Sequence, residues 1–367
     1  MSIRAAVMTR PHAPLEIWEF DTPRLEPGSV LLETVASEVC GTDVHLHRGR
    51  LAGVPYPIIP GHVSVGRVLE SAGVETDATG APLSPGDLVT FYDVHEVCGT
   101  CWHCLVAGQP NRCPSRRVYG ITYSAAEGLL GGWAERIYLK PGVRLFKLPE
   151  PLTASDVIGG GCGLFTGFAA VERSSFQMAE TVLIQGSGPV GLAAAAFSAL
   201  RGAALTIVVG APGDRLALAQ ALGADLTLSL EELSPRDRRE AVLEVTDGRG
   251  ADTVIEASGN PAAVNEGFDL LRDGGTYVIA GHYTDAGEIE LNPHLAINRK
   301  HAVVRGQWGT EFRHVFGALK LLAKHRNRLD FARVIGRRYG LEEANRAIDD
   351  VATLSVPKAV IEPETRA

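Results

Sequence analysis

The strongest constraint on the fold is a glycine-rich turn that follows an apolar strand and opens an alanine-rich helix. The segment TVLIQGSGPVGLAAAAF places Gly186, Gly188 and Gly191 in the spacing G-x-G-x-x-G. In this context the glycines permit a tight turn, close approach of a pyrophosphate to the backbone, and packing of the helix on the strand. The helix beginning near Pro189 would direct its positive N-terminus at the phosphates. The segment predicts a dinucleotide site; a purely structural strand–turn–helix is the alternative.

Alternation of strand and helix patterns continues after this turn. Apolar strand patterns occupy residues 206–211, 225–230, 251–258 and 276–281. Helical patterns occupy the intervening residues 215–224, 234–248 and 260–275. Consecutive strand–helix units build a parallel sheet with helices on both faces. We therefore expect an α/β protein with a Rossmann-type, doubly wound parallel sheet.

The rest of the chain has a different texture. Residues 5–9, 29–37, 65–71 and 87–94 are alternating or β-branched runs bounded by Pro and Gly, which is typical of short strands. Near the C-terminus, helices are expected at 311–326 and 340–353, followed by a strand at 357–363. This C-terminal part need not belong to the parallel sheet.

Length and charge limit the classes of protein to consider. A chain of 367 residues suggests roughly two domains. The net charge is −8 and there is no basic run, which argues against a nucleic-acid or membrane-surface partner. The N-terminus lacks the apolar core of a signal peptide, and no long uninterrupted apolar stretch predicts a transmembrane helix. We expect a cytoplasmic protein, in which cysteines stay reduced.

The end of the second strand bears on the choice of dinucleotide. An acidic residue there normally binds the adenine ribose of NAD. This chain has Gly210 instead, and Arg215 is the nearest cation. Arg215 could contact a phosphate or the adenine, or be a solvated helix charge, whereas Asp214 would repel a phosphate. The pattern favours NAD and leaves NADP open.

Four of the six cysteines lie in one short loop. They are Cys98, Cys101, Cys104 and Cys113, in the spacing C-x2-C-x2-C-x8-C. Closely spaced thiolates of this kind can surround one tetrahedral zinc ion, and a four-thiolate site is closed to substrate. Reduced surface thiols or disulfides are the alternative. A nucleic-acid zinc module is less consistent with the negative net charge.

Two cysteines remain outside this loop. Cys40 and Cys162 lie in separate segments, as does His62. Two thiolates and one imidazole form the ligand set of a catalytic zinc with an open fourth position. Spacing alone does not decide the matter, because isolated buried cysteines are usually inert core residues.

The chain resembles the zinc-containing medium-chain alcohol dehydrogenases nearly from end to end. The motifs that carry the resemblance are Cys-Gly-Thr-Asp at 40–43, Gly-His at 61–62, the four-cysteine loop, Gly-Gly-Trp-Ala-Glu at 131–135, Cys-Gly at 162–163, Thr-Gly at 166–167 and the glycine turn. The resemblance implies a β-rich, partly barrel-like (GroES-like) catalytic domain at 1–160 and 307–367. It implies a Rossmann domain at 161–306.

The same resemblance implies roles for individual residues. Cys40, His62 and Cys162 would hold a catalytic zinc, and the four-cysteine loop a structural zinc, giving two zinc ions per chain. Thr42 and His45 would pass on the proton of the alcohol, although His47 lies close by, and Asp43 would accept the second ring N–H of His62. The residues expected at the cofactor are Thr166, Gly186, Gly188, Pro189, Val190, Gly191, Gly210 and Arg215.

The implied reaction is hydride transfer between an alcohol and NAD(P), assisted by zinc. The expected substrate is a secondary alcohol, cyclic or bulky, or the matching ketone, and the expected assembly is a homodimer or homotetramer. One departure from the family pattern is Val63, where relatives usually carry Glu after the histidine. Glu38 and Glu135 are carboxylates that could partly substitute. Val63 also supports the alternative of a non-catalytic sensor or structural subunit that binds dinucleotide and zinc.

Overall fold

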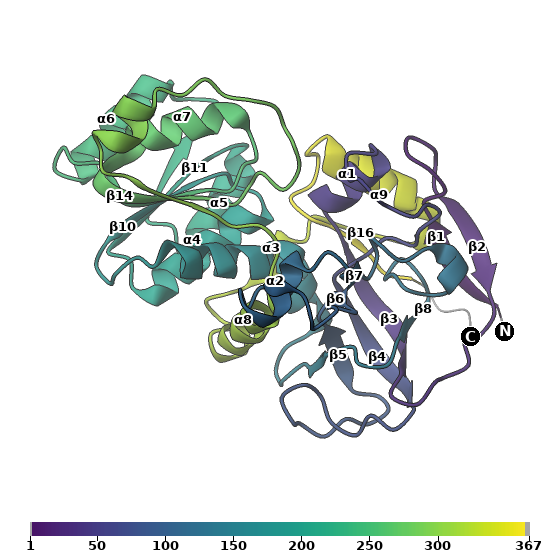
Figure 1. Cartoon of the computed structure of the whole chain (residues 1–367). Helices are drawn as coiled ribbons and strands as arrows, with labels where there is room; N and C mark the ends of the chain where they lie inside the picture. The colour runs from purple at the N-terminus through teal and green to yellow at the C-terminus, as the bar shows by residue number, and fades with distance from the viewer. Residues whose placement is uncertain (1, 364–367) are drawn as a thin grey trace. The chain divides into compact units, whose positions relative to one another are not determined.

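The computed structural model describes residues 2–363, which form two compact units (Figure 1). The first unit comprises Met1–Gly161, Glu311–Arg326 and Phe331–Ala367, of which Met1 and residues 364–367 lie outside the described residues. The second unit comprises Cys162–Thr310 and Asn327–Asp330. The boundary between Gly161 and Cys162 falls inside helix α3 (Ala154–Ser174).

A parallel sheet forms the centre of the second unit, with the strand order β12-β11-β10-β13-β14-β15 in the described residues. The strands are β10 (Thr181–Gln185), β11 (Leu205–Gly210), β12 (Leu226–Ser229), β13 (Ala251–Glu256), β14 (Leu271–Ile279) and β15 (Val303–Gly306). The helices between them are α4 (Pro189–Arg201), α5 (Gly213–Ala221), α6 (Pro235–Val245) and α7 (Pro261–Leu270). Figure 1 shows α6 and α7 on one side of this sheet and α4 and α5 on the other. The predicted doubly wound sheet is confirmed.

The local sequence explains why β10 and α4 form at the centre of this unit. Val182, Leu183 and Ile184 are fully buried, as expected for a central parallel strand covered on both faces. Helix α4 begins with Pro189 in its first turn, where the missing N–H costs no helical hydrogen bond. It ends at Gly202, whose left-handed backbone terminates the helix.

Several predicted helices are shorter than expected, and two of them show why. The helix predicted at 260–275 ends at Leu270, because Leu271 already has extended backbone angles (φ −77°, ψ 134°) and starts β14. The helix predicted at 340–353 is divided into the 3-10 turn η5 (Leu341–Glu343) and α9 (Ala344–Ala352). In both segments helical composition extends beyond the residues that the tertiary structure keeps helical.

The first unit is built around a mainly antiparallel sheet. In the described chain its strand order is β16-β17-β3-β4-β5-β9, with β8 also paired to β3. These strands are β16 (Arg337–Tyr339), β17 (Ala359–Ile361), β3 (Val30–Val39), β4 (Ser64–Ser71), β5 (Leu88–Phe91), β9 (Leu145–Lys147) and β8 (Arg136–Leu139). Two small antiparallel pairs join β1 (Ile3–Val7) to β2 (Glu16–Phe20) and β6 (Val94–His95) to β7 (Arg117–Val118). The C-terminal strand β17 pairs with β3, so the predicted strand at 357–363 belongs to this unit and not to the parallel sheet.

Short helices and turns complete the described chain. They are α1 (Gly41–His47), α2 (Trp102–Leu105), η1 (Pro110–Arg112), η2 (Ala125–Glu127), the π-helical turn η3 (His294–Asn298), α8 (Phe312–Lys324) and η4 (Phe331–Val334). Trp133, fully buried in the core of the first unit, donates from its indole nitrogen to the carbonyl of Glu38 at 2.9 Å. This bond ties the end of β3 to the core.

Helix α3 is the one described helix that is long and apolar enough to cross a membrane. Its mean hydropathy is 1.3, but 72% of the apolar window is buried inside the protein. It is also interrupted at Gly161, where the backbone is non-helical (φ 52°, ψ −141°). Burial and interruption are both typical of a core helix of a globular domain.

Candidate metal and cofactor sites

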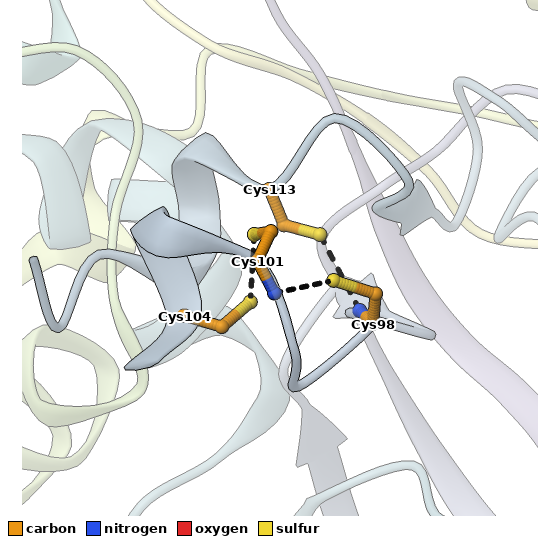
Figure 2. A group of neighbouring side chains, drawn as sticks. All are labelled: Cys98, Cys101, Cys104 and Cys113. Carbon is orange, nitrogen blue, oxygen red and sulfur yellow. Dashed lines mark hydrogen bonds between the residues drawn. The ribbon is translucent and has the colours of Figure 1, made fainter. Parts of the chain in front are cut away.

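Four cysteine thiols converge in the loop between β6 and β7 (Figure 2). Their sulfur atoms all lie within 4.8 Å of one another, and none of the described cysteines forms a disulfide. Cys101 precedes α2, Cys104 lies within it, and Cys113 follows η1 and is fully buried. Four thiolates bound to zinc at about 2.3 Å would stand about 3.8 Å apart, which matches this spacing. The donor set therefore fits a closed, structural zinc site.

Hydrogen bonds within this four-cysteine group already orient the sulfurs inward. The backbone N–H of Cys98 donates to the Cys113 sulfur, and that of Cys101 donates to the Cys98 sulfur, both at 3.3 Å. The Cys101 and Cys104 sulfurs are 3.5 Å apart (Figure 2). Backbone N–H groups aimed at sulfur stabilise the thiolate form that a metal requires.

A second group of potential ligands contains Glu38, Cys40, His62 and Cys162, here called the mixed group. One ligand atom from each residue lies within 4.8 Å of the others. The Cys40 sulfur is 4.0 Å from His62 Nε2, and Glu38 Oε1 is 3.3 Å from the same nitrogen. The structure thus brings Cys40, His62 and Cys162 together as the resemblance implies, and it adds a buried carboxylate.

The expected ligands of the mixed group lie at the end or at a break of an element, whereas Glu38 lies within β3. Cys40 follows β3 and caps α1, because its sulfur accepts the backbone N–H of Thr42 at 3.3 Å. His62 lies two residues before the start of β4, and Cys162 directly follows the break in α3 at Gly161. Residues remote in the sequence converge because β3 and β4 are neighbours in one sheet.

Asp43 lies beside these ligands but does not make the expected contact. Its Oδ2 accepts the backbone N–H of Cys40 at 2.9 Å and completes the cap of α1. The hydrogen bond expected between Asp43 and His62 is absent: Asp43 Oδ1 and His62 Nδ1 are both buried and lack a hydrogen-bond partner among the described residues. Asp43 is committed to the helix cap, which holds it in place beside the histidine.

The electrostatics of the mixed group favour a cation. Burial lowers the pKa of His62, but the charges of Cys40, Glu38 and Asp43 outweigh it and raise that pKa well above its ordinary value. Burial and the charge of Cys40 raise the pKa of Asp43. Negative groups packed around an imidazole in a buried pocket are compensated most directly by a metal ion. The donors, thiolate and imidazole with a carboxylate, fit zinc.

Thr42 and His45 lie one turn apart on α1, so their side chains share a face of that helix. Thr42 is buried and His45 is half-buried. Burial lowers the pKa of His45, and Arg50 lowers it further. His47, in contrast, is held by the carbonyl of Ala13, 3.1 Å from its Nε2. His47 is therefore engaged with the backbone, which distinguishes it from His45 as a candidate for the proton path.

The glycine turn in the second unit is shaped by close backbone contacts. Gly186 has φ 111°, and a β-carbon there would stand 3.0 Å from the Ala257 backbone. A β-carbon at Gly191 would overlap the Gly186 carbonyl oxygen at 1.9 Å. Gly188, by contrast, faces open space, and Pro189 and Val190 are partly exposed at the start of α4. The turn leaves room for a pyrophosphate at the helix N-terminus.

Steric contacts explain why Gly210 stands where many dinucleotide sites have an acidic residue. A β-carbon at Gly210 would stand 2.5 Å from the Ser187 hydroxyl, which donates to the Ala211 carbonyl at 2.9 Å. Arg215 lies in the first turn of α5 and is largely buried, which lowers its pKa. It is therefore not the solvated helix charge considered as the alternative. Thr166 lies in α3, partly exposed.

Comparison with known proteins bears directly on these sites. Residues 26–150 match the family model "Alcohol dehydrogenase GroES-like domain", and residues 189–324 match "Zinc-binding dehydrogenase". The 5-exo-hydroxycamphor dehydrogenase of Pseudomonas putida is 32% identical over 361 residues, which cover 98% of both chains. This chain belongs to the zinc-containing medium-chain alcohol dehydrogenase family.

Other relatives agree with this assignment. The sorbitol dehydrogenase of Halalkalibacterium halodurans is 30% identical over 292 residues, covering 77% of this chain and 78% of the relative. The crystal structure of an alcohol dehydrogenase from Thermotoga maritima superposes with a TM-score of 0.94 at 34% identity, covering 99% and 100% of the two chains. The structure of a zinc-binding dehydrogenase from Sinorhizobium meliloti, solved with bound NADP, superposes with a TM-score of 0.86 at 27% identity. This superposition also covers 99% of this chain and 100% of the relative. The protein is an NAD(P)- and zinc-dependent alcohol dehydrogenase.

The sequence alone left the role of Glu38 undecided and gave none to Lys358 or Gly161. Glu38 was one of two candidate carboxylates, and the structure separates them: Glu38 is in the mixed group, whereas Glu135 pairs with Arg4 at 2.7 Å. Lys358 and Gly161 were not singled out. A lysine directly before the apolar run at 359–361 was a signal for Lys358, and three consecutive glycines directly before Cys162 were a signal for Gly161.

Proposed function

We propose that the dehydrogenase oxidises a secondary alcohol, cyclic or bulky, at the mixed group and passes the hydride to NAD, or reduces the matching ketone with NADH. The observation that carries this proposal is the convergence of Cys40, His62 and Cys162, with ligand atoms within 4.8 Å of one another. These residues would hold the catalytic zinc, and Cys98, Cys101, Cys104 and Cys113 would hold the structural zinc.

The different proposed roles of the two metal-binding groups follow from the ligand atoms that each group supplies. The four-cysteine group supplies four thiolates and leaves no position for substrate, so its proposed task is to stabilise its loop. Within the mixed group, Cys40, His62 and Cys162 supply two thiolates and one imidazole, which leave a position for a substrate oxygen. When bound there, zinc would lower the pKa of an alcohol toward neutrality and polarise a carbonyl in the reverse direction.

The proposed proton path runs along α1. The Thr42 hydroxyl would accept a hydrogen bond from the substrate hydroxyl and pass the proton toward His45, one turn further along the same helix face. A lowered pKa keeps His45 neutral at neutral pH, so that its ring can accept this proton. Asp43 would orient the path indirectly by fixing the start of α1 through its bond to Cys40.

The proposed cofactor site lies at the start of α4. Gly186, Gly188 and Gly191, with Pro189 and Val190, would bind the pyrophosphate through the turn and the helix N-terminus. Thr166 would contact the cofactor from α3, while Gly210 and the buried Arg215 would border the adenine ribose. NAD is proposed as the cofactor, with NADP as the alternative to be measured in parallel; the nicotinamide ring supplies the hydride chemistry.

The substrate class is supported by the names of the relatives. They specify hydroxycamphor, sorbitol and threonine, each of which carries a secondary hydroxyl group, and the first is also cyclic. We further propose that residues 1–160 and 307–367 form the catalytic domain and residues 161–306 the cofactor domain. A homodimer or homotetramer in the cytoplasm is proposed as the working form.

A parallel screen tests the proposal. Secondary cyclic alcohols, open-chain polyols and primary alcohols are each offered with NAD and with NADP while reduced cofactor is measured by absorbance. We expect the highest kcat/KM with a cyclic secondary alcohol. The C162A variant should lose one zinc ion per chain and alcohol-dependent reduction. An active variant that keeps its full zinc content would refute the metal assignment, and cofactor binding without turnover of any alcohol would favour the sensor alternative.

A further inference from the structure

The inference concerns Glu38, which lies directly opposite Val63. The backbone N–H of Glu38 donates to the Val63 carbonyl at 3.1 Å, and the next pair along the strands is Ser37 with Ser64. Residues directly opposite each other in an antiparallel pair direct their side chains to the same face. A carboxylate at position 38 therefore emerges on the same side of the sheet as a side chain at position 63, immediately beside His62.

The carboxylate of Glu38 is held between two buried groups. Its Oε1 is 3.3 Å from His62 Nε2, the ring nitrogen that faces the Cys40 sulfur. Its Oε2 accepts from the ammonium of Lys358, which directly precedes β17, and β17 pairs with β3. Glu38 is 0% and Lys358 1% exposed. Even when two buried charges are paired, apolar residues in their place would often stabilise the fold as well. The buried pair therefore points to a function beyond packing.

The backbone that carries Cys162 is fitted to this ion pair. A β-carbon at Gly161 would stand 2.0 Å from Glu38 Oε2 and 2.5 Å from Lys358 Nζ. The Gly161 backbone angles (φ 52°, ψ −141°) lie in a region that residues with side chains rarely adopt. The break in α3 thus passes directly over the ion pair and then delivers Cys162 to the mixed group.

Charge balance explains why both partners are present. Zinc with the two thiolates of the mixed group carries no net charge, and Glu38 with Lys358 adds none. Without Glu38, Lys358 would be an uncompensated buried cation next to a metal ion. Without Lys358, the carboxylate would make the site negative and bind a metal cation more strongly. The lysine therefore moderates how firmly the carboxylate engages the metal.

We propose that Glu38 is the carboxylate of the catalytic zinc site: its Oε1 occupies the fourth ligand position when no substrate oxygen is there. Lys358 is the positioning residue that holds Oε2 and keeps the carboxylate within reach when it is displaced. The inference rests on the proposed function, because it assumes zinc at Cys40, His62 and Cys162. Val63 lacks a ligand atom, and the residue opposite it supplies one.

The test uses the purified full-length enzyme with cobalt or zinc in the catalytic site. E38Q removes the charge and keeps the shape, and E135Q is the matched control, because Glu135 is also buried and paired with a cation, Arg4. The readouts are the visible absorption spectrum of the cobalt enzyme without substrate, and the rate at which a chromogenic chelator removes the catalytic metal.

We expect E38Q to change the cobalt spectrum and to speed loss of the catalytic metal about tenfold or more, within the range known for residues around metal sites. E135Q should leave both readouts unchanged, and neither variant should affect the metal of the four-cysteine group. The E38V/V63E double variant, which exchanges the two facing side chains, should restore retention of the catalytic metal.

The inference and the proposed function can fail separately. If C162A loses one metal ion but E38Q keeps the wild-type spectrum and metal-loss rate, the role of Glu38 is refuted and the metal assignment stands. If C162A loses no metal, both are refuted. Should E38Q not fold, the E38Q/K358M double variant removes both charges together, and an unchanged cobalt spectrum in that protein overturns the inference equally.

Discussion

Cys40 and Asp43 cap the same helix reciprocally: the Cys40 sulfur accepts the N–H of Thr42, and the Asp43 carboxylate accepts the N–H of Cys40 at 2.9 Å. A proposed zinc ligand, Cys40, is thereby also the N-cap residue of α1, the helix that carries the proposed proton path. Positioning of the metal and folding of this helix are linked through these two residues.

Removing the carboxylate of Asp43 should therefore affect both stability and metal retention. In D43A the Cys40 N–H loses its acceptor, and we expect the free energy of unfolding to fall by about 1–2 kcal/mol. D43N keeps an acceptor oxygen and should retain most of that stability. Chemical denaturation measures the difference, and equal losses in the two variants would contradict the capping role.

The glycine turn offers a matched pair of substitutions. G191A places a methyl group 1.9 Å from the Gly186 carbonyl oxygen, and we expect a loss of about 1–3 kcal/mol in stability together with weaker cofactor binding. G188A meets open space, so its stability should hardly change, while the Kd for NAD should rise about tenfold or more. Thermal denaturation and fluorescence titration separate the two effects. Unchanged NAD affinity in G188A would contradict the predicted pyrophosphate site.

The thiols of the four-cysteine group should differ in reactivity once zinc is removed. Hydrogen bonds, above all from the backbone N–H of Thr100, lower the pKa of Cys98 to about 6. Partial burial and the Cys101 thiol raise the pKa of Cys104 to about 12. Because the thiolate is the reactive form, iodoacetamide at pH 7 should alkylate Cys98 first and Cys104 last.

Mass spectrometry of peptides after timed alkylation measures this order. The zinc-loaded protein is the control, in which all four thiols should be protected. Equal alkylation rates at Cys98 and Cys104 in the metal-free protein would show that the hydrogen bonds do not set their reactivity.

The pH dependence of alcohol oxidation should report on His45. Burial, and then Arg50, lower the pKa of this histidine, so its ring stays neutral to a lower pH than an ordinary histidine. Since the proposed role requires a neutral ring, activity should be lost only as the pH falls below the ordinary histidine value. In H45Q we expect kcat to fall. The decline of activity at low pH, the acidic limb of the pH–rate profile, should disappear.

His47 provides the control for this experiment. Its ring contacts the Ala13 carbonyl, so H47Q should keep the acidic limb of the wild type. A limb that disappears in H47Q and persists in H45Q would reverse the assignment of the proton path.

The parallel sheet and the four-cysteine group could be predicted because their signals are local. Strand–helix alternation and G-x-G-x-x-G spacing encode β10 and α4 within a single segment, and four thiols within sixteen residues must lie near one another. The limits of α7 and α9 could not be predicted to the residue. Tertiary contacts decide which residues of a segment with helical composition actually become helical. Cys40, His62 and Cys162 were recognised through motifs of a family and not through their spacing.

What the sequence determined by itself was the α/β class, the dinucleotide turn, and the residue types available to bind metal. Only the tertiary structure decided that Glu38 and Lys358, 320 positions apart, form a buried ion pair beside His62, and that Gly161 must lack a side chain to pass over it. The physical reason is that β17 returns from the C-terminus to pair with β3. Such proximity arises because the C-terminal strand folds back onto an N-terminal strand. A contact of this kind leaves no periodic pattern in the sequence.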